Sequence, residues 1–292
     1  MTRRRDLDRL RVERIEQAQG EETVYIEAVE FRREHFPTDR YYPFSIPVLR
    51  RTARVVFRHP VTFFVGKNGS GKSTLLEALA RGAGVHLWDM PRRHQASENP
   101  YETHLADFLK LIWTRRPSNI SLLRAETFRE LSDFLDDLAI CDPGRLQYHG
   151  GHLLSQLSHG QGILTYIRGR CQSGGLFLFD EPEAALSPAS QVGLLRFLYD
   201  RVRQGETQYV IVTHSPILLS LPGAQILSFD GPSIQEVRYE ETEHYRIYRQ
   251  LFEDPKGMLQ DAWLSSEKAI SDEQAAEAQP AVGVLSSAVS VP

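Results

Sequence analysis

Apolar residues in this chain gather in short runs, and polar or glycine-rich segments follow several of these runs directly. The runs at 61–65, 176–179 and 209–212 are apolar at nearly every position rather than at alternate ones. Strands buried on both faces of a parallel sheet have this composition. The pattern therefore predicts an α/β fold with a mainly parallel sheet, in which functional residues follow the strands at their carboxyl ends.

The remaining pattern predicts the domain organisation. Alternation at 24–31 and a second strand near 53–57 indicate an antiparallel N-terminal β part. Amphipathic helices at about 104–114 and 127–140, with a short strand at 120–126 between them, indicate a helical insertion over residues 85–157. We expect a charged N-terminal segment at 1–20, one domain at 21–264 and a disordered tail at 265–292.

Bulk composition changes this picture only slightly. The 292 residues are 41% hydrophobic and 25% charged, as in a soluble globular protein. The formal net charge of −4 provides no global electrostatic reason to bind nucleic acid. The two cysteines lie far apart in the sequence, which suits a reducing cytoplasm. Because no apolar run approaches the ~18 residues of a membrane span, we expect a cytoplasmic protein without membrane insertion.

A glycine-rich loop follows the first of these apolar runs and precedes a helix-favouring segment. It fits the pattern G-x-x-x-x-G-K-[ST] of a phosphate-binding loop (P-loop), in the strand–loop–helix context that the motif requires. Glycines let successive backbone N–H groups point at one anion, and the helix N-terminus adds partial positive charge. The predicted ATP-binding residues are Gly66, Lys67, Asn68, Gly69, Ser70, Gly71, Lys72, Ser73 and Thr74.

The other two runs also end in chemically active side chains. Asp180 and Glu181 follow the run at 176–179, and His214 follows the run at 209–212 after one threonine. We predict that Ser73 and Asp180 hold Mg²⁺, while Lys72 reaches the terminal phosphates of the nucleotide. Glu181 is the predicted base for the attacking water, and His214 the predicted sensor of the γ-phosphate. A solvated strand end is the weaker interpretation of Asp180 and Glu181.

With the segment Leu157-Ser-His-Gly-Gln161 included, the chain resembles an ABC-type ATPase. The P-loop, this signature segment, the Walker B strand at 176–180 and the switch histidine His214 have the order and spacing of that family over roughly residues 20–240. The resemblance implies an ATP-dependent head-to-tail homodimer. In it, Ser158, His159, Gly160 and Gln161 of one subunit would face the ATP of the other. His159 stands where the family usually has glycine.

Several points remain open in the sequence. Glu126 is the candidate to replace the glutamine that the family places near Mg²⁺, with Gln95 as the alternative. Aromatic residues at 41–44 could stack on adenine or pack in the core, and core packing is the commoner use.

The segment 180–188 resembles that of bacterial stand-alone ATPases near the RecF, SMC and overcoming-lysogenisation-defect branch, here without a coiled-coil arm. That resemblance favours action on DNA, in repair or defence. Two alternatives are the nucleotide-binding subunit of a transporter and a slow nucleotide-gated module that regulates a protein partner.

Overall fold

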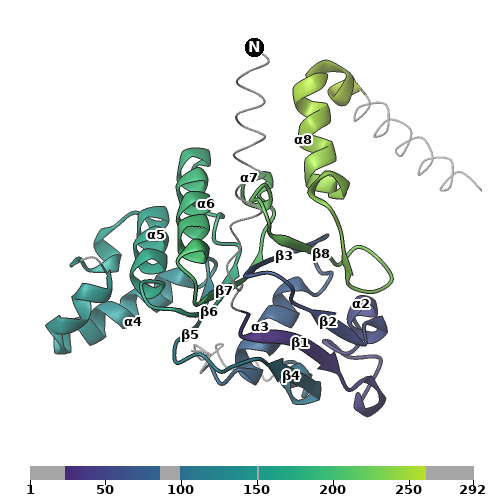
Figure 1. The fold of residues 1–292 in the computed structure, drawn as a ribbon, viewed down its shortest axis with the longest axis horizontal. Coiled ribbons are helices and arrows are strands. Elements are labelled where there is room, and N and C mark those ends of the chain that lie inside the picture. Colours follow the sequence, from purple (N-terminus) through teal and green to yellow (C-terminus); the bar gives the residue numbers. More distant parts are fainter. Residues whose placement is uncertain (1–23, 86–98, 150, 261–292) are drawn as a thin grey trace, which may run out of the picture. The chain divides into compact units, whose positions relative to one another are not determined.

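The computed structural model describes residues 24–85, 99–149 and 151–260. The chain divides into two compact units, Met1–Tyr245 and Arg246–Pro292, and both β-sheets belong to the first (Figure 1). The segments predicted at 1–20 and 265–292 lie outside the described residues, as does Gln95. The first unit ends before residue 264, which is the end predicted for the domain.

The large sheet has the order β5-β6-β7-β3-β8-β9, and its strands are parallel except for the last pair. This confirms the predicted α/β class with a mainly parallel sheet. The bounds of its strands, in chain order, are β3 (Val61–Val65), β5 (Ile120–Arg124), β6 (Gly175–Asp180), β7 (Thr207–Val212), β8 (Gln225–Ser228) and β9 (Gln235–Glu236).

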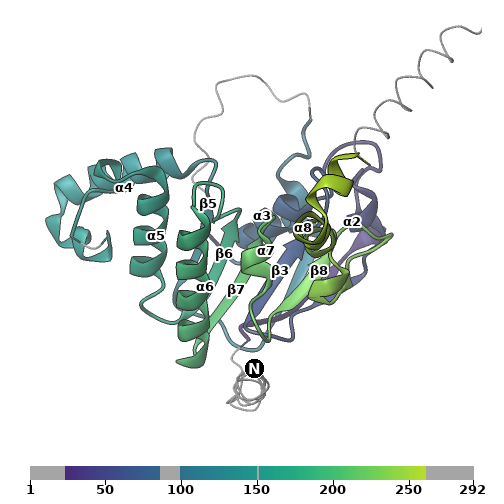
Figure 2. The same ribbon diagram turned by 90° about the horizontal axis from the view of Figure 1, so that it is seen from above.

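Burial on both faces explains why the central strands are apolar throughout. In β3, Phe64 packs in one hydrophobic cluster together with the helix α3 (Lys72–Gly82), and Phe63 packs in a second cluster on the other face. The second cluster contains residues of α5 (His159–Arg170) and α6 (Pro188–Arg203), which lie side by side (Figure 2). Helices on both faces leave no solvated face that would require polar alternation.

The small sheet confirms the predicted antiparallel N-terminal β part. Its order is β2-β1-β4, with antiparallel pairing on both sides of the central strand. The strands are β1 (Ile26–Phe31), β2 (Arg54–Val56) and β4 (Leu109–Trp113). Apolar residues of β1, β2 and β4 share a cluster with α3 and with one face of the large sheet, so α3 is covered on both sides.

The helix predicted at 104–114 is wrong. This segment forms a short 3-10 helix, η2 (His104–Phe108), and then strand β4. The sequence Leu-Lys-Leu also has the period of a strand, and pairing with β1 decides between the two. Lys110 lies opposite Glu30 in that pairing and forms an ion pair with it at 3.3 Å. The helical part of the insertion is therefore narrower than 85–157 and begins after β5.

The remaining helices of the first unit connect these strands. Beside α3, α5 and α6 they are α2 (Pro47–Arg51), α4 (Phe128–Cys141) and α7 (Pro216–Leu219), with 3-10 helices η1 (Arg33–His35), η3 (Pro143–His149), η4 (Leu154–Gln156) and η5 (Tyr239–Glu241). Helix α8 (Glu243–Glu253) begins in the first unit and continues in the second. None of the helices in the described ranges is long and apolar enough to cross a membrane.

Candidate active site

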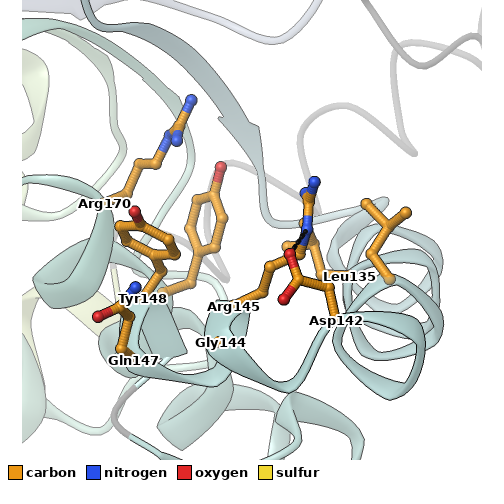
Figure 3. A pocket seen from close by; sticks show the side chains of 9 residues that line it. Leu135, Asp142, Gly144, Arg145, Gln147, Tyr148 and Arg170 are labelled. Carbon is orange, nitrogen blue, oxygen red and sulfur yellow. Dashed lines mark hydrogen bonds and ion pairs between the residues drawn. The ribbon is translucent and has the colours of Figure 1, made fainter.

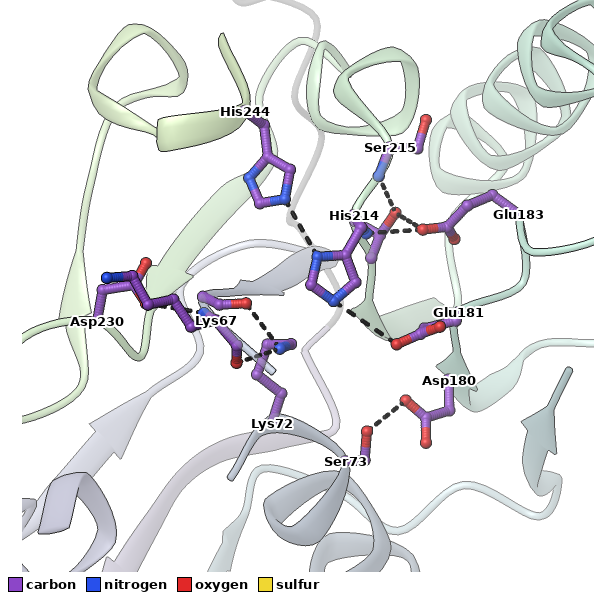
Figure 4. A network of polar contacts seen from close by, with 12 residues as sticks. Lys67, Lys72, Ser73, Asp180, Glu181, Glu183, His214, Ser215, Asp230 and His244 are labelled. Carbon is purple, nitrogen blue, oxygen red and sulfur yellow. Dashed lines mark hydrogen bonds and ion pairs between the residues drawn. The ribbon is translucent and has the colours of Figure 1, made fainter. Parts of the chain in front are cut away.

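Four neighbouring strands of the large sheet end level with one another. One row across the sheet consists of Phe64, Val212, Asp180 and Arg124. Gly66, Glu181 and His214 come one or two residues after members of this row. Side chains predicted from separate segments of the sequence therefore gather at one edge of the sheet (Figure 4).

The P-loop links β3 to α3 through glycines that adopt positive φ. Gly66 has a φ of 142°, Gly69 of 77° and Gly71 of 101°, which side-chain-bearing residues rarely adopt. The N–H group of Lys67 donates to Oδ1 of Asp230 at 2.8 Å, which ties the start of the loop to the end of β8. Contacts within the chain thus hold the loop in this shape.

Lys72 points into this loop. Its side chain is buried, and Nζ donates to the carbonyl oxygens of Gly66 at 2.7 Å and Lys67 at 2.9 Å. Burial lowers the pKa of Lys72, and the carboxylates of Glu181, Asp230 and Asp180 oppose that shift. The ammonium group is therefore held where phosphate oxygens would meet the loop.

Ser73 and Asp180 lie together, as predicted for a shared metal site. The Ser73 hydroxyl donates to Oδ1 of Asp180 at 2.8 Å. Burial raises the pKa of Asp180 from 3.8 to about 6, and the Ser73 hydrogen bond counteracts this shift. A hydroxyl and a carboxylate are hard oxygen donors of the kind that Mg²⁺ accepts, and a cation would stabilise the buried carboxylate. This pair of residues fits a magnesium ion.

Glu181 adopts a backbone conformation that differs from that of Asp180. Its φ is 49°, which is uncommon for a residue with a side chain, and its N–H donates to the carbonyl of Val212 at 3.0 Å. The carboxylate of Asp180 contacts Ser73, whereas that of Glu181 faces the His214 ring (Figure 4). Oε1 of Glu181 lies 3.6 Å from Nε2 of His214, longer than a hydrogen bond. A water molecule or phosphate oxygen could contact both groups.

Glu183 was not among the predicted site residues, yet it contacts the backbone of His214, the predicted sensor of the γ-phosphate. Its Oε1 accepts hydrogen bonds from the Thr213 hydroxyl at 2.6 Å and from the His214 N–H at 2.7 Å. Burial raises the pKa of Glu183, and those two hydrogen bonds oppose the shift. In the sequence, Glu183 stands out only as a second glutamate soon after Glu181. The neighbouring residues do not indicate that it contacts Thr213 and His214.

Two more residues near the site were missed. Asp230 contacts the P-loop, and its position two residues after β8, at the carboxyl edge of the sheet, could have indicated this. His244 lies in the first turn of α8, with Nε2 3.2 Å from Nδ1 of His214. No sequence pattern connects those two histidines.

The signature segment forms the beginning of α5. Ser158 is the N-cap: its Oγ accepts from the N–H of Gln161 at 3.4 Å, and Oε1 of Gln161 accepts from the N–H of Ser158 at 3.1 Å. A Cβ added at Gly160 would lie 2.4 Å from the carbonyl oxygen of Ala185, so glycine allows α5 to pack against the loop after β6. Within one chain the segment is a capped helix start.

Glu126 and His159 line the same cavity as the predicted metal ligands Ser73 and Asp180. The cavity has a volume of about 590 Å³ and is also lined by Ser73, Thr74, Asp180 and Glu181. Arg124 lines it too and forms an ion pair with Glu77 of α3. Glu126 is exposed, so its carboxylate is available to this cavity.

The aromatic residues at 41–44 differ in their surroundings, and only some of them pack in the core. Phe44 is fully buried and contacts Phe36 and Phe108, which is core packing. Tyr42 is 41% exposed, lines the site cavity, and has its hydroxyl 3.0 Å from the Thr74 hydroxyl. Tyr42 therefore lies beside the P-loop helix, where an adenine ring could be contacted.

A second cavity, of about 690 Å³, lies among α4, η3 and α5 (Figure 3). Its lining includes Tyr148, Tyr166, Arg170 and an ion pair of Arg145 with Asp142 at 3.3 Å. None of the predicted site residues is part of this lining, so it is separate from the site at the sheet edge.

Comparison with known proteins identifies the same segments. A family model described as "AAA domain, putative AbiEii toxin, Type IV TA system" matches residues 154–220, and one described as "AAA domain" matches residues 44–105. The first range contains the signature segment, the Walker B strand and His214, and the second contains the P-loop.

Curated relatives are ATP-binding proteins named for export, import or lipoprotein-releasing systems. The lipoprotein-releasing system ATP-binding protein LolD of Hahella chejuensis is 30% identical over 193 residues, which is 58% of this chain and 80% of LolD. The macrolide export ATP-binding/permease protein MacB of Marinobacter nauticus is 27% identical over 216 residues, or 67% of this chain. The chain spans about a third (32%) of the length of MacB.

Among solved structures, cbiO1 from Clostridium perfringens, described as part of the ABC transporter complex cbiONQ, is similar over 82% of this chain and 100% of its own. The TM-score is 0.49 and the sequence identity 15%.

Proposed function

The chain belongs to the ABC-type ATPases, and from that premise we propose that it binds Mg·ATP at the P-loop edge of the large sheet, dimerises head to tail on ATP and hydrolyses it to ADP and phosphate. One observation carries the proposal: Lys72, the Ser73–Asp180 pair, Glu181 and His214 converge where β3, β6 and β7 end.

Each side chain has a task that its position permits. Lys72 and the P-loop N–H groups bind the phosphates, and the imidazole of His214 contacts the γ-phosphate. Ser73 and Asp180 would hold Mg²⁺, which when bound neutralises charge on the phosphates. Glu181 accepts a proton from the water that attacks the γ-phosphorus. The bond to the β-phosphate oxygen then breaks, and its electron pair stays on ADP.

The proposed dimer gives the start of α5 a function. Ser158 and Gln161 cap α5 within one chain, and the partial positive charge at a helix N-terminus favours an anion. In a head-to-tail dimer this N-terminus would face the γ-phosphate held by the P-loop of the partner subunit. ATP would then stabilise the interface and hydrolysis would weaken it.

The test is a Glu181→Gln variant, in which the water is no longer deprotonated. With Mg·ATP we expect it to elute as a dimer in size-exclusion chromatography with light scattering, whereas the wild-type protein returns to monomer as ATP is consumed. Ser158→Arg in the same background is the matched control, since it blocks the facing surface and should restore the monomer. A Glu181→Gln protein that binds ATP yet stays monomeric would contradict the dimer.

The process served by this ATPase is a separate proposal. The description of the family model that matches residues 154–220 names a putative toxin, which supports a stand-alone ATPase in defence as one candidate. DNA as its target rests on the sequence resemblance alone. A transporter subunit is an equally supported candidate, since LolD is named for a lipoprotein-releasing system and MacB for macrolide export. ATPase activity stimulated by added DNA would support the first. Co-purification of Glu181→Gln with a membrane protein would support the second.

A further inference from the structure

Two histidine rings meet next to the proposed catalytic base. His214 follows β7, and His244 belongs to the first turn of α8, thirty residues later. Nδ1 of His214 lies 3.2 Å from Nε2 of His244, and the ring centroids are 5.4 Å apart. The other nitrogen of His214 is directed toward Glu181 (Figure 4). His244, His214 and Glu181 therefore form a row that ends at the reacting groups.

The pKa shifts of both rings favour their neutral forms. Burial lowers the pKa of His214, and the charge of Lys72 lowers it further. Burial also lowers the pKa of His244, and neighbouring His214 contributes to that shift. A neutral imidazole has one N–H donor and one acceptor nitrogen, so a contact between two ring nitrogens needs one hydrogen, on one ring only.

The neighbours of His214 decide which ring supplies that hydrogen. A carboxylate such as that of Glu181, or an anionic phosphate oxygen, only accepts hydrogen bonds. Nε2 of His214 must therefore carry the hydrogen if it is to interact with either group. Its Nδ1 is then the acceptor, and Nε2 of His244 must be the donor.

We propose that His244 is a positioning residue for ATP hydrolysis: its Nε2–H donates to Nδ1 of His214 and keeps the hydrogen of His214 on Nε2, toward Glu181 and the γ-phosphate. This inference rests on the function proposed above. Glu183 holds the backbone N–H of His214, whereas His244 holds the ring, so the two residues restrain different parts of the same histidine.

A purely space-filling role fits His244 less well. Its Nδ1 is buried and has no hydrogen-bond partner among the residues that the structure describes. Leaving a buried polar atom unpaired costs stability, and an apolar side chain would avoid that cost. The contact with His214 supplies a reason for an imidazole at this position.

The first test measures steady-state kinetics of the full chain. His244→Leu removes the donor that orients the His214 ring. We expect kcat to fall about tenfold, with KM for ATP changed less than about threefold. His244→Gln places an amide N–H near the position of Nε2, and we expect it to retain most of the wild-type kcat. Equal kcat values for His244→Leu and wild type would overturn the proposal.

The second test is independent of activity. ¹⁵N chemical shifts of labelled histidines distinguish the two neutral tautomers, and His214→Asn assigns the signals of His214. We expect His214 with its hydrogen on Nε2 in the wild-type protein and in His244→Gln, and a mixture of tautomers in His244→Leu. Hydrogen on Nδ1 of His214 in the wild type would overturn the inference. Because this result needs no turnover, it stands apart from a failure of the proposed ATPase function.

Discussion

The hydroxyl of Ser73 lies 2.8 Å from Oδ1 of Asp180, although 107 positions of sequence separate them. This contact joins the first turn of α3 to the last residue of β6. It places a buried carboxylate beside the P-loop, where the effect of burial on the pKa of Asp180 outweighs the opposing effects of the Ser73 hydrogen bond and of the charges of Arg124 and Lys72. The ionised form of Asp180 is therefore less favourable in the folded protein than in the unfolded chain.

Replacing Asp180 by asparagine should stabilise the protein that is free of Mg²⁺ and nucleotide, in a pH-dependent way. Burial raises the pKa of Asp180 from 3.8 to about 6, so the folded state keeps this proton up to a higher pH than the unfolded chain does. Stability is consequently lost as pH rises from the unfolded to the folded pKa. At pH 7.5 we expect Asp180→Asn to gain up to about 3 kcal/mol in free energy of unfolding.

Urea denaturation at pH 7.5 and pH 5 measures this difference. The gain should shrink at pH 5, where the folded wild-type protein keeps most of the proton on Asp180. Asp137→Asn, at an exposed position of α4, is the control and should change little at either pH. An equal gain for Asp180→Asn at both pH values would contradict the electrostatic explanation.

Lys72→Ala should nearly abolish ATP binding. An ammonium group about 4 Å from a phosphate charge near a protein surface is worth about 4 kcal/mol, so Kd should rise about a hundredfold or more. Isothermal titration calorimetry measures this change. Lys67→Ala is the matched control: Lys67 is exposed and contributes its backbone groups, so its side chain should be nearly dispensable. Normal affinity in Lys72→Ala would show that the site is assigned wrongly.

Gly160→Ala should destabilise the chain. The added Cβ would lie 2.4 Å from the carbonyl oxygen of Ala185, so α5 and the loop after β6 must separate. We expect a loss of about 1–3 kcal/mol in the free energy of unfolding. Gly193→Ala in α6 has open space around the new Cβ and should gain about 0.5–1 kcal/mol. Thermal denaturation measures both changes in stability. A Gly160→Ala protein that is at least as stable as the wild type would show that the contact with Ala185 does not require glycine at this position.

Glu183→Ala should lower kcat through the position of His214. The variant leaves the Thr213 hydroxyl and the His214 N–H without their acceptor, which should also cost about 1–3 kcal/mol of stability. Glu183→Gln keeps an acceptor oxygen at the same position. It should therefore retain more of the wild-type kcat and more of the wild-type stability than Glu183→Ala does. Measuring kcat and unfolding together separates the two effects, and a Glu183→Ala enzyme with wild-type kcat would contradict the positioning role.

Local sequence patterns were sufficient to predict a segment where residues adjacent in the chain determine its structure. The strand 61–65, the P-loop and the helix from Lys72 follow directly from apolar residues, glycines and helix formers in sequence order. The carboxyl end of the 176–180 strand could also be located, because strands buried on both faces are apolar until they leave the sheet.

Only the tertiary structure decided the elements and contacts that depend on residues far apart in the sequence. Residues 109–113 became a strand because β1 offered hydrogen bonds and an ion pair across 80 positions, which the local pattern cannot reveal. The contacts of Glu183 and His244 with His214 likewise span about thirty residues and exist because the sheet edge and α8 bring them together. The sequence determined which groups the chain possesses for phosphate chemistry, and long-range packing determined which of them meet.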